Sequence, residues 1–159
     1  MRFRIVAVGK IKEPYLKDGI AEYAKRLSGS AVLEITEVAD EPLPNRDREA
    51  EAARILDREG ERILGAIQPG ETVVLLDVGG SMWSSEELAG IIRENALAGR
   101  SRIAFVIGGT LGAAPAVRAR ADYRWSLSRA TFPHQIVRLL VAEQVYRAVR
   151  IIRGEAYHR

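Results

Sequence analysis

The sequence predicts an α/β domain with a mainly parallel sheet and helices on both faces. Two continuous apolar runs, TVVLLDV at residues 72–78 and RIAFVIGG at residues 102–109, are typical of strands that are buried on both faces. Segments with helical spacing of apolar residues alternate with the strand candidates along the whole chain, and that alternation is typical of parallel sheets. No internal repeat or linker interrupts the 159 residues, so we expect one domain over residues 1–159.

In the first half of the chain, short strands alternate with longer helices. RIVAVG at residues 4–9 is an apolar strand, and AVLEITEVA at residues 31–39 alternates as a half-buried strand does. Between them, residues 14–27 carry apolar side chains at helical spacing. The proline-containing stretch EPLPNRD is predicted to be a loop, and it leads into a long helix over residues 47–66.

In the second half, the turn and capping signals define the elements. GGSMW at residues 79–83 is predicted to turn the chain after the first buried strand. Ser84 then opens a helix that ends near Gly99, because Glu87 three residues later completes a capping box. After the second buried strand come a glycine-rich loop, a short helix and YRWSLS, which is predicted to be a fifth strand.

The composition excludes several classes of protein. The chain has no cysteine and only two histidines, so it offers neither a disulfide scaffold nor a usual zinc site. It has no apolar run of about 18 residues, so no transmembrane helix is expected. Its start, MRFRIVAVGK, becomes polar too quickly for a signal peptide. We therefore expect a cytoplasmic protein without a metal and without a membrane partner.

The charge of the chain is unevenly distributed. From Ala114 onward nine arginines stand against three acidic residues, whereas the preceding part has 15 basic and 18 acidic residues. This C-terminal third contains arginine but no lysine, and such a positive segment indicates a phosphate-bearing partner. A solvated surface with an arginine bias is the alternative interpretation.

Glycines follow both buried strands, in LLDVGG and in FVIGGTLG. Ligands of open α/β sheets bind beyond the carboxyl ends of the strands, where glycine allows close approach to the backbone. The spacing matches neither the GxGxxG fingerprint nor a P-loop, so the usual nucleotide-binding motifs are not supported. Taken alone, these glycines are better explained by tight turns than by a ligand site.

The last helix is predicted to begin at Pro133, a favoured first helical position. His134 and Arg138 share its face with Ala142, Val145, Val149 and Ile152. Two interpretations of Arg138 are equally plausible: it is buried and paired with a carboxylate or with carbonyl oxygens, or it binds a ligand directly. His134 is better explained as a helix-start histidine than as a catalytic one. Residues 136–152 are apolar nearly all round, which predicts burial on two sides, one of them against a second subunit of a homodimer.

Several motifs together resemble a known family. The SPOUT-class methyltransferases, and more closely the ribosomal RNA large-subunit methyltransferase H family, are similar over the full chain in these motifs: LLDVGG with Trp83 and SSEEL, FVIGGTLG, WSLSRATFPHQIVRLLVAEQVYRA and the terminal AYHR. The resemblance implies a C-terminal trefoil knot, a homodimer and S-adenosylmethionine as cofactor. It further implies methylation at N3 of a pseudouridine in 23S ribosomal RNA, on free RNA or on the assembled ribosome.

The resemblance also suggests where the site residues lie. The cofactor contacts that it implies are Leu76, Gly108, Leu127, Ser128, Arg129, Ala130, Thr131 and Phe132. The predicted RNA contacts are Arg129, Arg138, Arg150 and Arg153, with solvated arginines as the alternative. Tyr157, His158 and Arg159 are predicted to help form the active site, since tyrosine can stack on a base and histidine can accept a proton near neutral pH.

Other interpretations remain open. The terminal Tyr157–Arg159 segment can instead dock on the partner subunit, and His134 is the competing base. A different nucleotide-dependent α/β enzyme lacks support because its usual motifs are missing. A non-catalytic RNA-binding α/β module is the main alternative, although such a module needs no glycine-lined pocket at two strand ends.

Overall fold

The computed structural model describes residues 1–43 and 49–158. Ten elements follow one another along the chain: β1 (Arg2–Val8), α1 (Pro14–Leu27), β2 (Val32–Val38), α2 (Glu49–Ala66), β3 (Thr72–Met82), α3 (Ser85–Leu97), β4 (Arg102–Ile107), α4 (Pro115–Arg120), β5 (Tyr123–Ser126) and α5 (His134–Ile152). The last four residues of the loop expected at EPLPNRD, 44–47, and the expected helix start at residue 47 lie outside the described residues.

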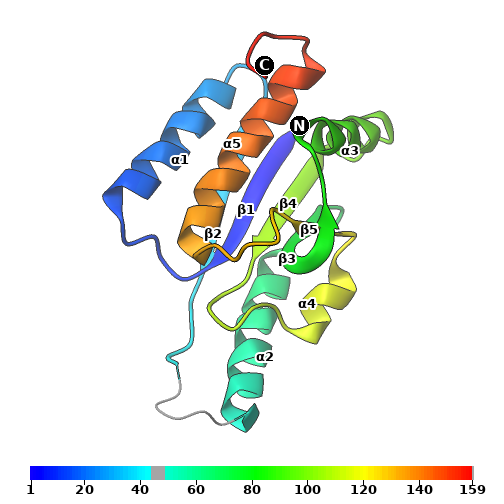
Figure 1. The fold of residues 1–159 in the computed structure, drawn as a ribbon. Coiled ribbons are helices and arrows are strands. Elements are labelled where there is room, and N and C mark those ends of the chain that lie inside the picture. Colours follow the sequence, from blue (N-terminus) through cyan, green and yellow to red (C-terminus); the bar gives the residue numbers. More distant parts are fainter. Residues whose placement is uncertain (44–48, 159) are drawn as a thin grey trace.

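All five strands form one parallel sheet, in the order β2-β1-β4-β3-β5. Helices α1, α3 and α5 cover one face and α2 and α4 cover the other (Figure 1). The two faces are served by alternate residues of the same strands: in β1, Phe3 and Ile5 pack toward α1 and α5, whereas Val6 and Val8 pack toward α2. The expected α/β class with helices on both faces is confirmed.

The third strand is longer than the sequence predicts. Gly79 and Gly80 were expected to turn the chain, but the strand continues to Met82 and pairs again with β5 after a register shift between Leu76 and Ser81. A Cβ on Gly80 would lie 2.6 Å from the carbonyl oxygen of Arg124, so only glycine lets the two backbones approach this closely. The expectation of a turn at GGSMW is therefore wrong.

Helix α3 begins where the sequence places it. The hydroxyl of Ser84 accepts a hydrogen bond of 3.1 Å from the Glu87 N–H, and the Glu87 carboxylate accepts one of 2.6 Å from the Ser84 N–H. This reciprocal pair satisfies two donors that the first helical turn would otherwise leave free. The predicted capping box is confirmed.

Arg138 holds the start of α5 against the sheet. Its side chain is fully buried, and its guanidinium donates to the Glu37 carboxylate at 2.8 Å and to the carbonyl oxygens of Val8 and Gly9 at 2.8 and 3.0 Å. The prediction of an RNA contact is wrong for Arg138, because no part of this side chain reaches solvent. The alternative of a buried, paired guanidinium is the one that the structure has.

The described residues contain no helix that is both long enough and apolar enough to cross a membrane.

Candidate functional site

A cavity of about 500 Å³ lies where the carboxyl ends of β3, β4 and β5 meet the start of α5. Three segments that are far apart in the sequence form most of its lining, namely the end of β3, the loop after β4 and the loop before α5, and Arg118 of α4 adds to it. Seven of the eight predicted cofactor residues are among its lining residues: Leu76, Gly108, Leu127, Ser128, Ala130, Thr131 and Phe132. The eighth, Arg129, is exposed and is not part of the wall.

The end of β3 is held by the carboxylate of Asp77. One oxygen accepts a 2.9 Å hydrogen bond from the Gly79 N–H, and the other accepts two from the Arg124 guanidinium at 2.7 and 2.9 Å. Burial by itself raises the pKa of Asp77, but the Gly79 N–H and the nearby guanidiniums outweigh it, and the pKa is lowered overall. An ionised Asp77 therefore holds the part of β3 where the register shifts, between Leu76 and Ser81, beside the cavity.

The loop after β4 folds tightly on itself. A Cβ on Gly108 would lie 2.4 Å from the carbonyl oxygen of Gly112, and Gly112 itself has a φ of 92°. The Gly112 N–H donates to the Gly109 carbonyl at 3.0 Å. Since no side chain projects from these glycines, the loop presents its backbone to the cavity.

Glu59 of α2 lies behind this loop, a position that no sequence motif predicts. A Cβ on Gly109 would lie 2.9 Å from a Glu59 carboxylate oxygen, and the same carboxylate accepts a 3.0 Å hydrogen bond from the Glu41 N–H. Burial raises the pKa of Glu59. The only sequence signal was an acidic residue four positions after Ile55, on the buried side of the helix.

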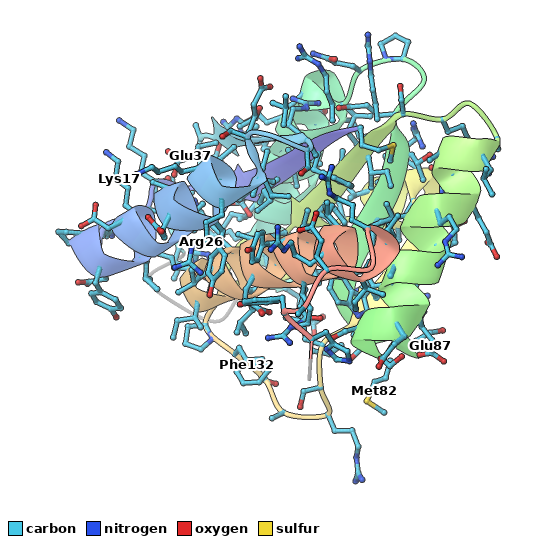
Figure 2. All side chains as sticks on the ribbon, turned by 90° about the horizontal axis from the view of Figure 1, so that it is seen from above. Lys17, Arg26, Glu37, Met82, Glu87 and Phe132 are labelled. Atoms are coloured by element: carbon cyan, nitrogen blue, oxygen red, sulfur yellow. The ribbon has the colours of Figure 1, made fainter. Side chains whose placement is uncertain are left out.

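Two serines order the loop before α5. The Ser126 hydroxyl donates to the Ser128 carbonyl, and the Ser128 hydroxyl accepts from the Ala130 N–H, each at 2.9 Å. Trp125 lies beneath them, 2% exposed, and stacks on Trp83 with ring centroids 5.5 Å apart. The loop ends at Phe132, whose side chain is 38% exposed and projects away from the ribbon (Figure 2).

Two polar atoms at the cavity have no partner among the described residues. The indole nitrogen of Trp125 and the Nδ1 of His134 are both buried and make no hydrogen bond with residues 1–43 or 49–158. Burial and the nearby charge of Arg138 lower the pKa of His134, so its imidazole is neutral at pH 7. Unpaired buried polar atoms are costly, and a bound molecule can satisfy them.

The C-terminal segment does not line this cavity. Tyr157 packs edge-on against Tyr146 at 4.7 Å, and its hydroxyl donates to Glu143 at 3.2 Å. Burial, Tyr23 and Glu143 raise the pKa of Tyr157 to about 12. His158 lies 2.6 Å from a Glu86 carboxylate oxygen, so the segment docks on α5 and α3 of its own chain. Arg159 lies outside the described residues.

Comparison with known proteins identifies the family. A family model described as "Predicted SPOUT methyltransferase" matches residues 1–158. The chain belongs to the SPOUT methyltransferase family. The expectation of a methyltransferase is thereby confirmed, and the family implies the knotted fold.

Relatives in this family match the chain from end to end. Proteins named ribosomal RNA large subunit methyltransferase H are 54% identical in Desulfitobacterium hafniense (strain DSM 10664 / DCB-2), 53% in Carboxydothermus hydrogenoformans and 52% in Bacillus pumilus. Each alignment covers all of this chain and at least 99% of the relative. The resemblance seen in the sequence motifs therefore extends over the whole SPOUT chain.

The remaining arginines that were predicted to contact RNA occupy different environments. Arg129 is exposed on the loop beside the cavity. Arg150 and Arg153 lie at the other end of α5, where both pair with Glu155, the latter at 2.6 Å. In residues 1–43 and 49–158, no group of three or more His, Asp or Glu side chains is arranged to hold a metal ion.

Proposed function

We propose that this SPOUT protein uses S-adenosylmethionine to methylate N3 of a pseudouridine in 23S ribosomal RNA. The observation that carries the proposal is the convergence of three distant chain segments on one cavity, at the sheet edge where α/β proteins bind ligands. The relatives' printed name supports the ribosomal substrate. A ribosomal substrate would place the protein in the cytoplasm.

The residues of the cavity fit this cofactor. A volume of about 500 Å³ lies within the usual range for small-molecule sites, and the walls combine glycines of the loop after β4 with apolar side chains such as Leu76 and Phe132. The Trp125 indole nitrogen and the His134 Nδ1 have no hydrogen-bond partner among the described residues, and polar atoms of a bound cofactor could supply one. Leu76, Gly108 and residues 127–132 would hold the cofactor, which supplies a methyl group made electrophilic by the positive sulfur.

The chain's own contribution to the reaction is alignment and proton removal. The rigid loops would orient the methyl group toward the attacking nitrogen, and an aligned pair reacts far faster than free partners do. N3 must lose its proton, and we assign this step to the terminal segment, with His158 as base and Tyr157 and Arg159 as contacts to the nucleotide. Tyr157 and His158 do not border the cavity of their own chain, so the assignment requires that a second subunit supply them.

A homodimer would bring that segment to a cavity. Apolar side chains are exposed near the cavity, with Val78 at 72%, Met82 at 58% and Phe132 at 38%. Exposed apolar groups of this kind are typical of association surfaces. Along α5, Ile136 and Leu140 remain partly exposed, and a partner helix could cover them. Light scattering should give twice the 17.6 kDa mass of one chain, and a monomer at micromolar concentration would contradict the homodimer.

The function is tested by binding and transfer measured on the same preparation. Calorimetry with S-adenosylmethionine tests the cofactor, and mass analysis of nucleosides tests transfer to 23S RNA, free 50S subunits and 70S ribosomes. We expect methylated pseudouridine from at least one of these substrates. Ribosome binding without cofactor binding would favour the non-catalytic RNA-binding module. Cofactor binding without transfer to any of the three would show that the substrate is a different one.

A further inference from the structure

One permanent cation lies among the described residues that line the cavity. Arg118 of α4 lines it beside Asp77, and the remaining titratable lining residue, His134, is neutral at pH 7. The side chain of Arg118 is 50% exposed, so it stands at the rim and not in the interior. A positive charge in this position faces whatever molecule enters the cavity from solvent.

The guanidinium of Arg118 lies near Asp77 but makes no hydrogen bond with the described residues. Its Nε lies 3.7 Å from an Asp77 oxygen, which is beyond hydrogen-bond distance, and no described residue accepts a hydrogen bond from it. Asp77 is already engaged by Arg124 and by the Gly79 N–H. Since Nε is the atom nearest to Asp77, the two terminal nitrogens are free to bind a ligand on the exposed side.

The local charge is positive. Arg118 and Arg124 share the one carboxylate of Asp77, which leaves a net charge of about +1 at this edge of the cavity. Arg118 is half exposed, its nearest nitrogen lies 3.7 Å from Asp77, and Asp77 keeps its 2.7 Å contact with Arg124, so redirecting Arg118 toward a ligand costs little. By contrast, Arg150 and Arg153 already pair with Glu155 at the far end of α5.

We propose that Arg118 binds a phosphate of the RNA backbone beside the nucleotide that enters the cavity. This inference rests on the proposed function. A guanidinium with a free terminal edge matches a phosphate in two parallel hydrogen bonds, and the Asp77 carboxylate lies on the opposite side of the group, 3.7 Å from Nε. The half-exposed Arg118 stands at the rim of the cavity, where its free edge faces solvent. This position favours a phosphate of the RNA outside the cavity over the carboxylate of a cofactor inside it. Such a contact positions the RNA without reading its sequence.

The test compares Arg118→Gln with Arg93→Gln by measuring ribosome binding over a range of KCl concentrations. Arg93 is an exposed arginine of α3 with no hydrogen bond or ion pair among the described residues, so it is a matched charge control. In Arg118→Gln we expect about 10-fold weaker binding at low salt and a salt slope reduced by about one. Arg118→Lys should keep the slope and lose affinity, since it keeps the charge without the planar fork. Arg93→Gln should resemble the wild type.

Two results would overturn the inference. Equal affinity and slope in Arg118→Gln and Arg93→Gln would show that Arg118 contacts no phosphate. Weaker S-adenosylmethionine binding with an unchanged slope would assign Arg118 to the cofactor's carboxylate. Thermal unfolding of each variant identifies any change that comes from misfolding, and Arg118→Lys gives a second variant for the comparison.

The two proposals fail in different ways. If the wild type transfers methyl groups while the slope of Arg118→Gln is unchanged, this inference alone is wrong. If the wild type transfers none, the proposed function is wrong, and the ribosome-binding slopes still decide whether Arg118 contacts phosphate.

Discussion

Replacement of Gly108 by alanine tests whether the loop after β4 forms the cofactor site. The added Cβ would lie 2.4 Å from the Gly112 carbonyl oxygen and 2.7 Å from its carbon, against an ordinary contact of 3.4 Å. The loop must therefore shift by about 1 Å, and such overpacking typically costs about 1–3 kcal/mol. The φ of Gly108 is not positive, so the effect is steric and not one of backbone strain.

The same shift should weaken cofactor binding. Because the loop backbone lines the cavity, moving it misaligns at least one hydrogen bond of about 1–1.5 kcal/mol, which corresponds to roughly tenfold in affinity. Isothermal calorimetry with S-adenosylmethionine measures the affinity, and urea unfolding measures the stability. Gly108→Val adds two further methyl groups and should have a larger effect on both.

Gly90→Ala is the matched control. Nothing lies within 4 Å of a Cβ at Gly90, which is inside α3 and away from the cavity. Alanine there should leave affinity unchanged and raise stability by up to about 1 kcal/mol, because glycine is a poor helix former. A folded Gly108→Ala protein with wild-type affinity would refute the assignment of this loop to the cofactor.

Three further predictions follow from other contacts. Arg138→Ala should lower the free energy of unfolding in urea by about 2–5 kcal/mol, since it leaves a cavity where a fully buried side chain stood and removes the hydrogen bonds to the Val8 and Gly9 carbonyls; loss of ribosome binding at unchanged stability would contradict this. Deleting residues 157–159 should abolish methyl transfer while cofactor binding and the dimer persist, and normal turnover would make the segment a packing element only. Burial by itself raises the pKa of Glu71, but hydrogen bonds from Arg4 and a backbone N–H outweigh it, and the pKa is lowered overall. The free energy of unfolding should therefore fall as the pH drops through and below the ordinary value of 4.5. In Glu71→Gln this fall, measured by unfolding at several pH values, should be smaller, and an unchanged pH dependence would contradict the role of this pair.

The apolar and capping patterns were sufficient to predict most elements. The buried runs became β3 and β4, and the Ser84 capping box begins α3, because burial on both faces and helix capping leave a local signal in the sequence. The extension of β3 through Gly79 and Gly80 was missed. Glycine permits both a turn and a close strand approach, and only the neighbouring backbone of β5 selects between them.

Charged residues show the limit of prediction from sequence most clearly. Arg138 and Arg118 are both arginines of the basic C-terminal third, yet one is fully buried and the other is half exposed at the cavity. The partners of Arg138 lie 101 to 130 positions away in the chain, so no local pattern could indicate them. Whether a guanidinium pairs internally or stays free depends on which carboxylates the fold brings near it.

The strand and helix alternation, the parallel α/β class and, through the motifs, the SPOUT family are all evident from local patterns in the chain. Four features depend on three-dimensional packing: the strand order, the meeting of three strand-end loops in one cavity, the position of Glu59 behind Gly109, and the docking of Tyr157 and His158 on their own chain. The two groups of features differ in how far apart in the chain the interacting residues lie. Periodicity and capping are set by residues within about one helical turn, whereas strand neighbours and ion pairs are set by packing between segments that are distant in the sequence.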